Sequence, residues 1–122
     1  MARTVLQPGP QHPITVAPAP TRVTVRAGDT PVADTTAALA LQEADYPVVY
    51  YIPLGDVRSE VLKPSDHTTY CPFKGDASYY SLVTADGEVT DAVWYYPEPY
   101  PAVAEIAGHV AFYANKVDIT AA

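Results

Sequence analysis

Two runs of residues decide the fold of this chain: Ala77-Ser78-Tyr79-Tyr80-Ser81-Leu82-Val83-Thr84 and Val89-Thr90-Asp91-Ala92-Val93-Trp94-Tyr95-Tyr96. Both are rich in β-branched and aromatic residues, which favour strands. The residues between them are Ala85-Asp86-Gly87-Glu88, and an Asp-Gly pair is a strong signal for a tight hairpin turn. The stretch therefore predicts two adjacent antiparallel strands.

The residues before this hairpin predict further strands. Arg22–Arg26 alternates polar and apolar residues, which places Val23 and Val25 on the buried face of a strand. Ala27–Thr30 has turn chemistry, and Pro31–Thr35 returns as the second strand of another hairpin. Both elements add to an antiparallel β pattern.

The middle of the chain also favours strands over helices. Ala37–Glu43 contains helix-forming residues, but Leu39 and Leu41 fit the alternation of a strand, which is the interpretation we adopt. Pro47–Pro53 is β-branched and aromatic, and it is predicted to be a strand.

Two short helical turns are expected. One covers Val57–Leu62, with Asp56 as its N-cap. The other covers Ala102–Ala107, because Pro101 suits a first helical position and Gly108 suits a stop.

The end of the chain completes the pattern. Val110–Tyr113 and Val117–Thr120 are predicted to finish the sheet around a turn at Asn115. Many short strands with little helix indicate an all-β fold, a small antiparallel sandwich or partly open barrel with one or two short helices. The length of 122 residues fits a single domain, which we assign to residues 21–122.

Residues 1–20 are predicted to form a proline-rich arm. Prolines fix φ and remove backbone donors, so this segment is expected to be extended. Pro13–Val16 has the character of a short edge strand. The arm is either laid over the domain or a free tail, and the sequence leaves both open.

Charge and cysteine content exclude some function classes. The net charge is −7, with seven Lys and Arg against fourteen Asp and Glu. Because binding to nucleic acid or to anionic membranes requires clustered cations, we expect neither partner. The single cysteine rules out an internal disulfide and paired Cys-x-x-Cys zinc ligands. No secretory signal or membrane span is evident, so we expect a cytoplasmic protein.

Three tyrosine pairs occupy predicted strands: Tyr50-Tyr51, Tyr79-Tyr80 and Tyr95-Tyr96. Successive residues of a strand point to opposite faces, so each pair sends one ring to each side of the sheet. If the strands are neighbours, one face carries a stack of aromatic rings. The stack is either an aromatic pocket wall or ordinary core packing.

The loop before the first hairpin strand carries reactive side chains, since His67, Cys71 and Lys74 lie within eight positions. Cys71 is a candidate nucleophile, with Lys74 favouring its thiolate and His67 acting as base. The alternative is that a lone cysteine is a small buried hydrophobic residue. The three histidines, His12, His67 and His109, lack the spacing of a metal site, and we predict no metal and no cofactor.

Lys74 lies in a Pro-x-Lys-Gly turn, where Gly75 allows a ligand to approach the backbone closely. The lysine either binds an anion or pairs with a structural carboxylate such as Asp34 or Asp56. Trp94 shares a face with Tyr96 and is either core or pocket wall.

Several phrases resemble a known family, the bacterial domain-of-unknown-function family numbered 427. They are His12-Pro13-Ile14-Thr15, Val32-Ala33-Asp34-Thr35, Val49-Tyr50-Tyr51-Ile52-Pro53 with Asp56-Val57, Thr69-Tyr70-Cys71-Pro72-Phe73-Lys74-Gly75, Ala92-Val93-Trp94-Tyr95-Tyr96-Pro97 and Ile106-Ala107-Gly108-His109-Val110-Ala111-Phe112-Tyr113. The resemblance covers nearly the whole chain and implies a compact antiparallel domain similar to the β-tent folds. Many tent folds hold zinc with two Cys-x-x-Cys pairs, which this chain lacks.

The same family has sometimes carried a nucleotidyltransferase label. Nucleotidyl transfer requires close carboxylates around Mg²⁺ and a phosphate-gripping loop. The only Asp-x-Glu here is Asp86-Gly87-Glu88, which turn chemistry explains. We therefore expect the label not to describe this chain.

Our leading hypothesis is a non-catalytic module that binds a small molecule or a protein partner. Its pocket residues are predicted to be Tyr51, Asp56, Cys71, Lys74, Trp94 and Tyr96. The alternatives are a small enzyme that uses Cys71 or Lys74, and a structural module that forms a homodimer through an edge strand.

Overall fold

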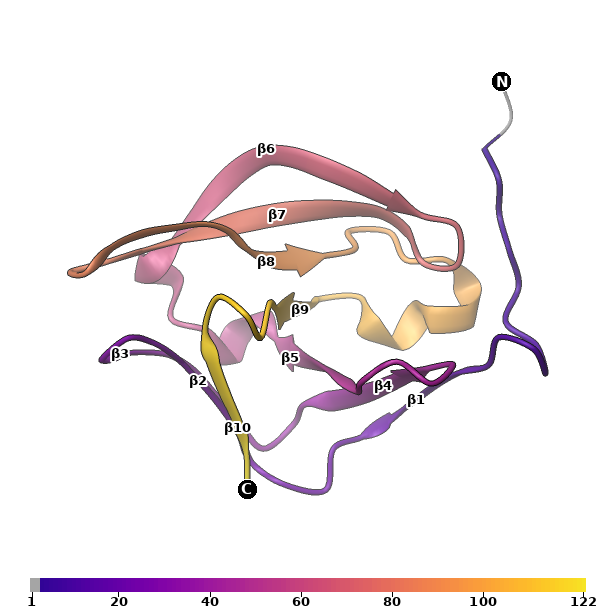
Figure 1. Cartoon of the computed structure of the whole chain (residues 1–122), viewed down its shortest axis with the longest axis horizontal. Coiled ribbons are helices and arrows are strands. Elements are labelled where there is room, and N and C mark those ends of the chain that lie inside the picture. Colours follow the sequence, from indigo (N-terminus) through magenta and orange to yellow (C-terminus); the bar gives the residue numbers. More distant parts are fainter. Residues whose placement is uncertain (1–2) are drawn as a thin grey trace.

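The computed structural model describes residues 3–122, and Met1 and Ala2 of the predicted arm lie outside the described residues. It consists of two open antiparallel sheets and confirms the all-β prediction (Figure 1). The seven-stranded sheet has the order β1-β4-β5-β9-β8-β7-β6, and the three-stranded sheet has the order β10-β2-β3. The strands are β1 (Ile14–Pro18), β2 (Val23–Ala27), β3 (Thr30–Thr35), β4 (Leu39–Glu43), β5 (Val49–Pro53), β6 (Leu62–Cys71), β7 (Gly75–Thr84), β8 (Gly87–Tyr95), β9 (His109–Phe112) and β10 (Asp118–Ala121).

The hairpin predicted from the central stretch is confirmed as β7 and β8. Thr84 pairs with Gly87 across the turn. Gly87 has a φ of 118°, a conformation that side chains other than hydrogen rarely adopt. The glycine of the Asp-Gly pair therefore supplies the positive φ that this turn requires.

The seven-stranded sheet curls about β9, with three strands on either side of it. β6, β7 and β8 form an upper half, and β1, β4 and β5 form a lower half (Figure 1). The short strand β9 joins them, and its register pairs it with β5 only at Ile52 and Pro53 and with β8 only at Val93 and Trp94. Because this ladder is so short, the two halves can fold about it.

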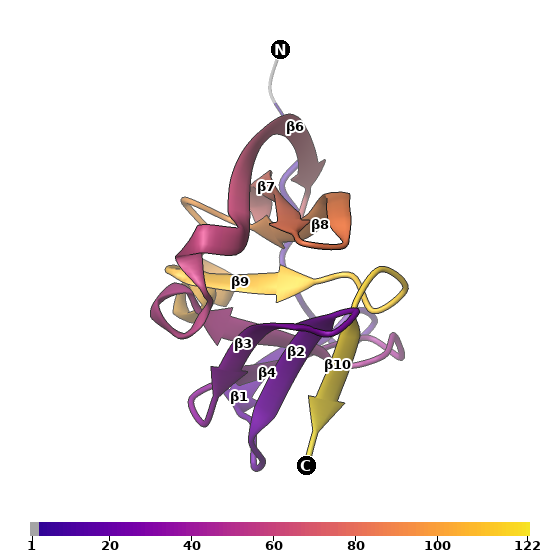
Figure 2. The ribbon, with the colours of Figure 1, turned by 90° about the vertical axis from the view of Figure 1, so that its left-hand side faces the viewer.

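The three-stranded sheet covers the other side of the curled sheet. Figure 2 shows β9 crossing between the β7–β8 hairpin above and the strands β10, β2 and β3 below. The β2–β3 hairpin and the inward positions of Val23 and Val25 are confirmed, since both valines are buried. These side chains form a core with Ile52, Leu82 and Val93.

The last two strands correct one expectation. They were predicted to finish a single sheet together, but β9 belongs to the seven-stranded sheet and β10 pairs with β2. The turn between them is closed by bonds from the amides of Lys116 and Val117 to the carbonyl of Tyr113. Because Val117 is buried in the core beneath the second sheet, the turn directs β10 onto the free edge of β2.

The helical turn predicted over 57–62 is wrong in its extent. Two separate 3-10 helices occur there, η1 (Leu54–Asp56) and η2 (Ser59–Val61), with Val57 extended between them. Val57 is buried and bridges to Ala33 of β3, so tertiary packing interrupts the helix. Asp56 therefore ends η1 and caps nothing with its side chain, which is why the N-cap interpretation fails.

The second helical prediction is confirmed as η3 (Pro101–Ile106), with Pro101 at its start and Gly108 two residues beyond its end at a φ of 77°. Near the N-terminus, β1 lies at the edge of the seven-stranded sheet, where an edge strand was predicted. In the described part of the chain, no helix is long and apolar enough to cross a membrane.

Candidate functional site

A cavity of about 290 Å³ opens on the inner face of the curled sheet, between its two halves. This volume lies at the lower end of the range for small-molecule pockets. The lining side chains come from both halves of the sheet and from the segments that join them. They are Leu41, Glu43, Tyr46, Pro47, Val49, Tyr51, Thr69, Lys74, Tyr79, Trp94, Tyr96 and Tyr113.

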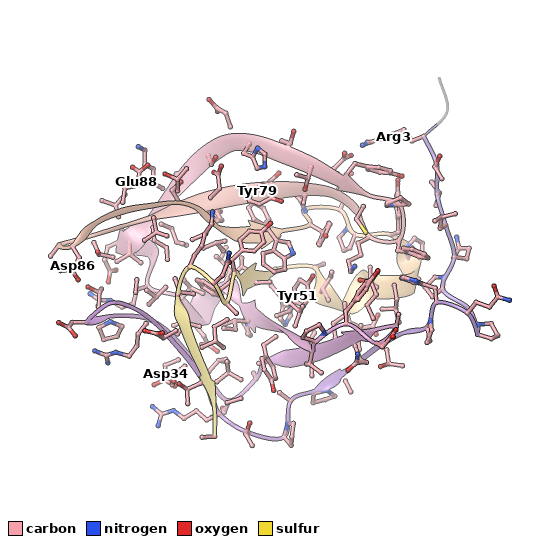
Figure 3. The ribbon with its side chains drawn as sticks, in the orientation of Figure 1. Arg3, Asp34, Tyr51, Tyr79, Asp86 and Glu88 are labelled. Carbon is pink, nitrogen blue, oxygen red and sulfur yellow. The ribbon has the colours of Figure 1, made fainter. Side chains whose placement is uncertain are left out.

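One tyrosine of each predicted pair faces this cavity. Tyr51, Tyr79 and Tyr96 belong to the cluster around the cavity, and their pair partners pack against the valine core on the other face. The alternation expected from strand geometry is thus confirmed. Tyr51 from the lower half and Tyr79 from the upper half both lie in the space between the halves (Figure 3).

The ring of Trp94 contacts two of the tyrosine rings around the cavity, those of Tyr51 and Tyr113. It lies 4.5 Å from the ring of Tyr113 and meets Tyr51 edge-on at 6.4 Å between ring centroids. Such aromatic contacts hold the walls in fixed orientations. The aromatic part of the cavity is therefore formed before any ligand arrives.

A chain of polar contacts crosses one end of the cavity. The Lys74 ammonium donates to Glu43 Oε1, and Glu43 Oε2 lies 2.8 Å from His12 Nε2. Lys74 is only 6% exposed, and its Nζ also lies 3.8 Å from Cys71 Sγ. The ring of His12 stacks on Phe73 at 4.2 Å. The site thus holds a buried cation with its charge already paired.

The turn before β7 directs Lys74 inward. Its amide donates to the carbonyl of Cys71 at 3.2 Å, and its carbonyl accepts from the amide of Tyr100 at 2.9 Å. Gly75 follows with a φ of 112°, and a Cβ there would come within 3.3 Å of the Glu98 carbonyl. The glycine after Lys74 is therefore needed for backbone packing against the segment that leads into η3.

Glu43 is ionised more readily than an ordinary glutamate. Burial disfavours its charge, but hydrogen bonds from Lys74 and His12 outweigh burial and lower the pKa of the carboxyl. The site therefore keeps the carboxylate charged at neutral pH.

The cavity tyrosines stay protonated over a wide pH range. Burial raises the pKa of Tyr51 and of Tyr96 far above the usual value, and burial together with a hydrogen bond between the Tyr113 and Tyr79 hydroxyls raises the pKa of Tyr113 to about 12. The hydroxyl of Tyr79 links Thr69 Oγ1 at 2.9 Å to Tyr113 Oη at 3.2 Å. A protonated phenol carries an O–H donor, and Tyr51 and Tyr96 both line the cavity.

The structure brings together most of the residues selected from the sequence. Tyr51, Lys74, Trp94 and Tyr96 line the cavity, and Cys71 packs against the same cluster without lining it. Asp56 lies elsewhere and accepts a hydrogen bond from Thr35 Oγ1 at 2.6 Å.

Two predicted partnerships are corrected. Lys74 pairs with Glu43 and not with Asp34 or Asp56, because Asp34 is held by Arg22 on the surface and Asp56 by the Thr35 hydroxyl. The ring of His67 packs on Tyr79 at 4.5 Å. Among the described residues, no hydrogen bond joins His67 to Cys71.

Glu43 and His12 are the polar residues that the sequence analysis missed. Glu43 follows Leu39 and Leu41 at a spacing of two, so the alternation already placed a carboxylate on an apolar strand face. That signal was available in the sequence. His12 had none, because it reaches the site through a contact between segments 31 residues apart.

Asp86 and Glu88 lie at the tip of the β7–β8 hairpin, away from Tyr51 and Tyr79 (Figure 3). Glu88 pairs with Lys63 at 3.0 Å, and Asp86 is in the turn with its amide bonded to Thr84 Oγ1. Within residues 3–122, no three His, Cys, Asp or Glu side chains are grouped so that they would hold a metal ion.

Fold and site together define a small all-β protein with an aromatic cavity built around a buried lysine–glutamate pair. Residues 15–122 match the model of the family described as Domain of unknown function (DUF427), which has the short label NTP_transf_9, and the chain belongs to this family. No curated protein matches the chain.

Proposed function

We propose that the protein is a non-catalytic binding module that takes a small, uncharged molecule with an aromatic or apolar body into the cavity. The observation that carries the proposal is the aromatic wall around a charge pair that is already complete. Pockets of this kind combine an apolar lining with a few fixed polar groups that orient a ligand.

The charge balance of the site favours an uncharged ligand. Among the described residues, Lys74 is the one lysine or arginine that lines the cavity, and Glu43 already compensates its charge. An anionic ligand would add a buried charge without a partner, which is costly. The overall charge of −7 opposes anions further.

The donors of the site favour a ligand with a hydrogen-bond acceptor such as a carbonyl. An ammonium has three N–H donors, and Glu43 and Cys71 engage two of those of Lys74. The remaining donor and the hydroxyls of Tyr51 and Tyr96 are available to a carbonyl oxygen. The aromatic rings then contact the rest of the molecule.

Trp94 supplies a direct test, since it is the only tryptophan and lines the cavity. Its emission would be titrated with neutral amides and ketones, and in parallel with nucleotides, sugar phosphates, carboxylates and divalent metals. We expect neutral carbonyl compounds to change the emission. Tyr96→Phe, which removes one hydroxyl, should weaken their binding by about 2- to 10-fold.

Tyr95→Phe is the matched control, because Tyr95 precedes Tyr96 in sequence and packs on the opposite face. It should leave the affinity unchanged. Stronger binding of phosphates or carboxylates than of neutral compounds would overturn the choice of ligand class. No response to any compound would favour the structural, dimer-forming alternative.

The enzyme alternative rests on Cys71 and Lys74. The engagement of Lys74 by Glu43 favours a fixed electrostatic role for the lysine over a nucleophilic one. Any activity detected in the purified protein should be compared with Cys71→Ala, and retention of that activity would remove the nucleophile hypothesis.

We further propose that residues 3–20, the described part of the predicted arm, close one end of the cavity, in a protein of the cytoplasm. His12 binds Glu43, and the amide of Leu6 donates to the Pro72 carbonyl at 3.0 Å. Both contacts lie beside the Lys74 turn, which supports a role for the arm in holding that turn.

A further inference from the structure

A second hollow of about 410 Å³, which we call the apolar groove, lies next to the cavity. Its outer part is formed by Val48, Tyr50, Phe112, Ala114 and Ile119, none of which lines the cavity. Within the part of the chain that the structure describes, no Asp, Glu, Lys, Arg or His side chain lines the groove. It is therefore suited to an apolar group.

The cavity and the apolar groove share a wall. Tyr46, Pro47, Val49, Trp94 and Tyr113 line both. The cavity lies on the inner face of the curled sheet, whereas Tyr50, Phe112 and Ile119 pack on the valine core of the other face. The two hollows thus meet across the sheet itself.

The pairing of the strands explains how they meet. β5 pairs with β9 only at Ile52 and Pro53, while Val49–Tyr51 pairs only with β4 on its other side. On the N-terminal side of Ile52, β5 is therefore not paired with β9, and the sheet is split there between β5 on one side and β8 and β9 on the other. The shared wall, including Val49 and Trp94, stands at this split.

We propose that the cavity and the apolar groove are two parts of one site for an uncharged amphiphile. Its carbonyl head occupies the cavity, and its apolar chain passes the split and lies along the groove. The position of the head rests on the function proposed above, whereas the position of the chain rests on the shared wall.

The groove fits a ligand chain better than a protein partner. A stable protein interface buries about 800 Å² on each side. The large exposed hydrophobic side chains at the groove are Tyr46 and Val48, and the others in the described chain are scattered, such as Val5, Leu54 and Val83. The apolar surface at the groove is too small for such an interface.

The test uses N-alkylacetamides from N-butylacetamide to N-decylacetamide, with Trp94 emission as the readout. Because N-butylacetamide is small, it fits the cavity alone. We expect each further methylene that enters the groove to lower Kd by two- to fourfold. The upper value corresponds to a fully buried methylene, which contributes about 0.8 kcal/mol.

Val48→Asp places a charge in the groove, and Val83→Asp is its matched control on β7. The two valines are 42% and 44% exposed, so neither change disturbs the core. Val48→Asp should abolish the gain with chain length and leave the affinity for N-butylacetamide unchanged. Val83→Asp should keep the full gain.

The outcomes separate the two proposals. Binding of N-butylacetamide without a gain from longer chains would overturn this inference and leave the proposed function standing. Equal chain-length gains in Val48→Asp and Val83→Asp would also overturn it. If light scattering showed that Val48→Asp, but not Val83→Asp, has a lower molar mass in solution than the wild type, the groove would be a contact between copies of the chain and this inference would be overturned. Failure of every acetamide to bind would overturn both proposals.

Discussion

The two faces of strands β5 and β7, and of β8 with the residue that follows it, carry the same residue type in different surroundings. The inner tyrosines are Tyr51, Tyr79 and Tyr96, and the outer tyrosines are Tyr50, Tyr80 and Tyr95. The inner rings are buried around a cavity that holds a lysine–glutamate pair. The outer rings are half-buried against a core of valines, with Tyr80 and Tyr95 stacked at 5.0 Å.

The difference comes from what covers each face. The outer face is covered by the three-stranded sheet, whose residues Val23, Val25 and Val32 are 1% exposed or less. The inner face is covered mainly by the curl of its own sheet and by η3. A separate sheet can pack closely, whereas a curled sheet leaves space at the centre of the curl. The covering layer therefore decides which tyrosines surround the cavity and which pack on the valine core.

The largest expected effect is a difference in the free energy of unfolding between two leucine-to-alanine variants, one in each region. Leu82 is fully buried in the valine core, and Leu41 is 2% exposed but lines the cavity. Leu82→Ala leaves a new void and should lower the free energy of unfolding by about 4 kcal/mol, whereas Leu41→Ala enlarges an existing hollow and should cost about 2 kcal/mol. Urea denaturation measures both, and equal losses would mean that the two regions are packed alike.

A second prediction concerns the charge pair of the inner face. Glu43→Gln leaves the Lys74 ammonium buried without a counter-charge and should cost about 3 kcal/mol. The matched control is Asp34→Asn, which breaks the surface pair with Arg22 and should change the unfolding midpoint little. Similar losses for the two variants would contradict the claim that burial makes the inner pair important.

The wild type and Glu43→Gln should differ in the pH dependence of their stability, because the pKa of the Glu43 carboxyl is lowered in the folded state. The stability that this carboxylate contributes is complete above the ordinary pKa of 4.5, and it is lost as the pH falls through the lower pKa of the folded state. The wild type should therefore lose more stability than Glu43→Gln below about pH 4.5. Urea midpoints at neutral and acidic pH would show this as a narrowing gap.

The smallest expected effect is at alkaline pH. Burial raises the pKa of Tyr51 and Tyr96 in the folded state, so their contribution to stability is complete below about pH 10 and is lost as the pH rises further. At pH 10.5 each should account for a loss of about 1 kcal/mol, which Tyr51→Phe or Tyr96→Phe would remove. Tyr50→Phe, on the outer face, is the control. If it reduced the loss of stability at pH 10.5 by the same amount, the distinction between the two faces would be wrong.

Local patterns predicted much of the strand content. The hairpin at Asp86-Gly87 and the strand at Leu39–Glu43 follow from turn chemistry and from alternation, which depend only on neighbouring residues. The helical turn after Asp56 was wrong, because the contact of Val57 with β3 overrides a local preference. Part of the site was also visible early, since alternation alone sent one tyrosine of each pair to each face of the sheet.

The amino-acid sequence by itself determined the all-β class, the β2–β3 and β7–β8 hairpins and the division of the tyrosines between two faces, whereas the strand β6 and its hairpin with β7 were not predicted. The predicted features repeat at a spacing of two and need no knowledge of distant contacts. Only the tertiary structure decided which face became a cavity, that Glu43 and not Asp34 or Asp56 would pair with Lys74, and that His12 would join them. Those choices depend on how the sheet curls about the short ladder of β9, which brings together residues about thirty positions apart.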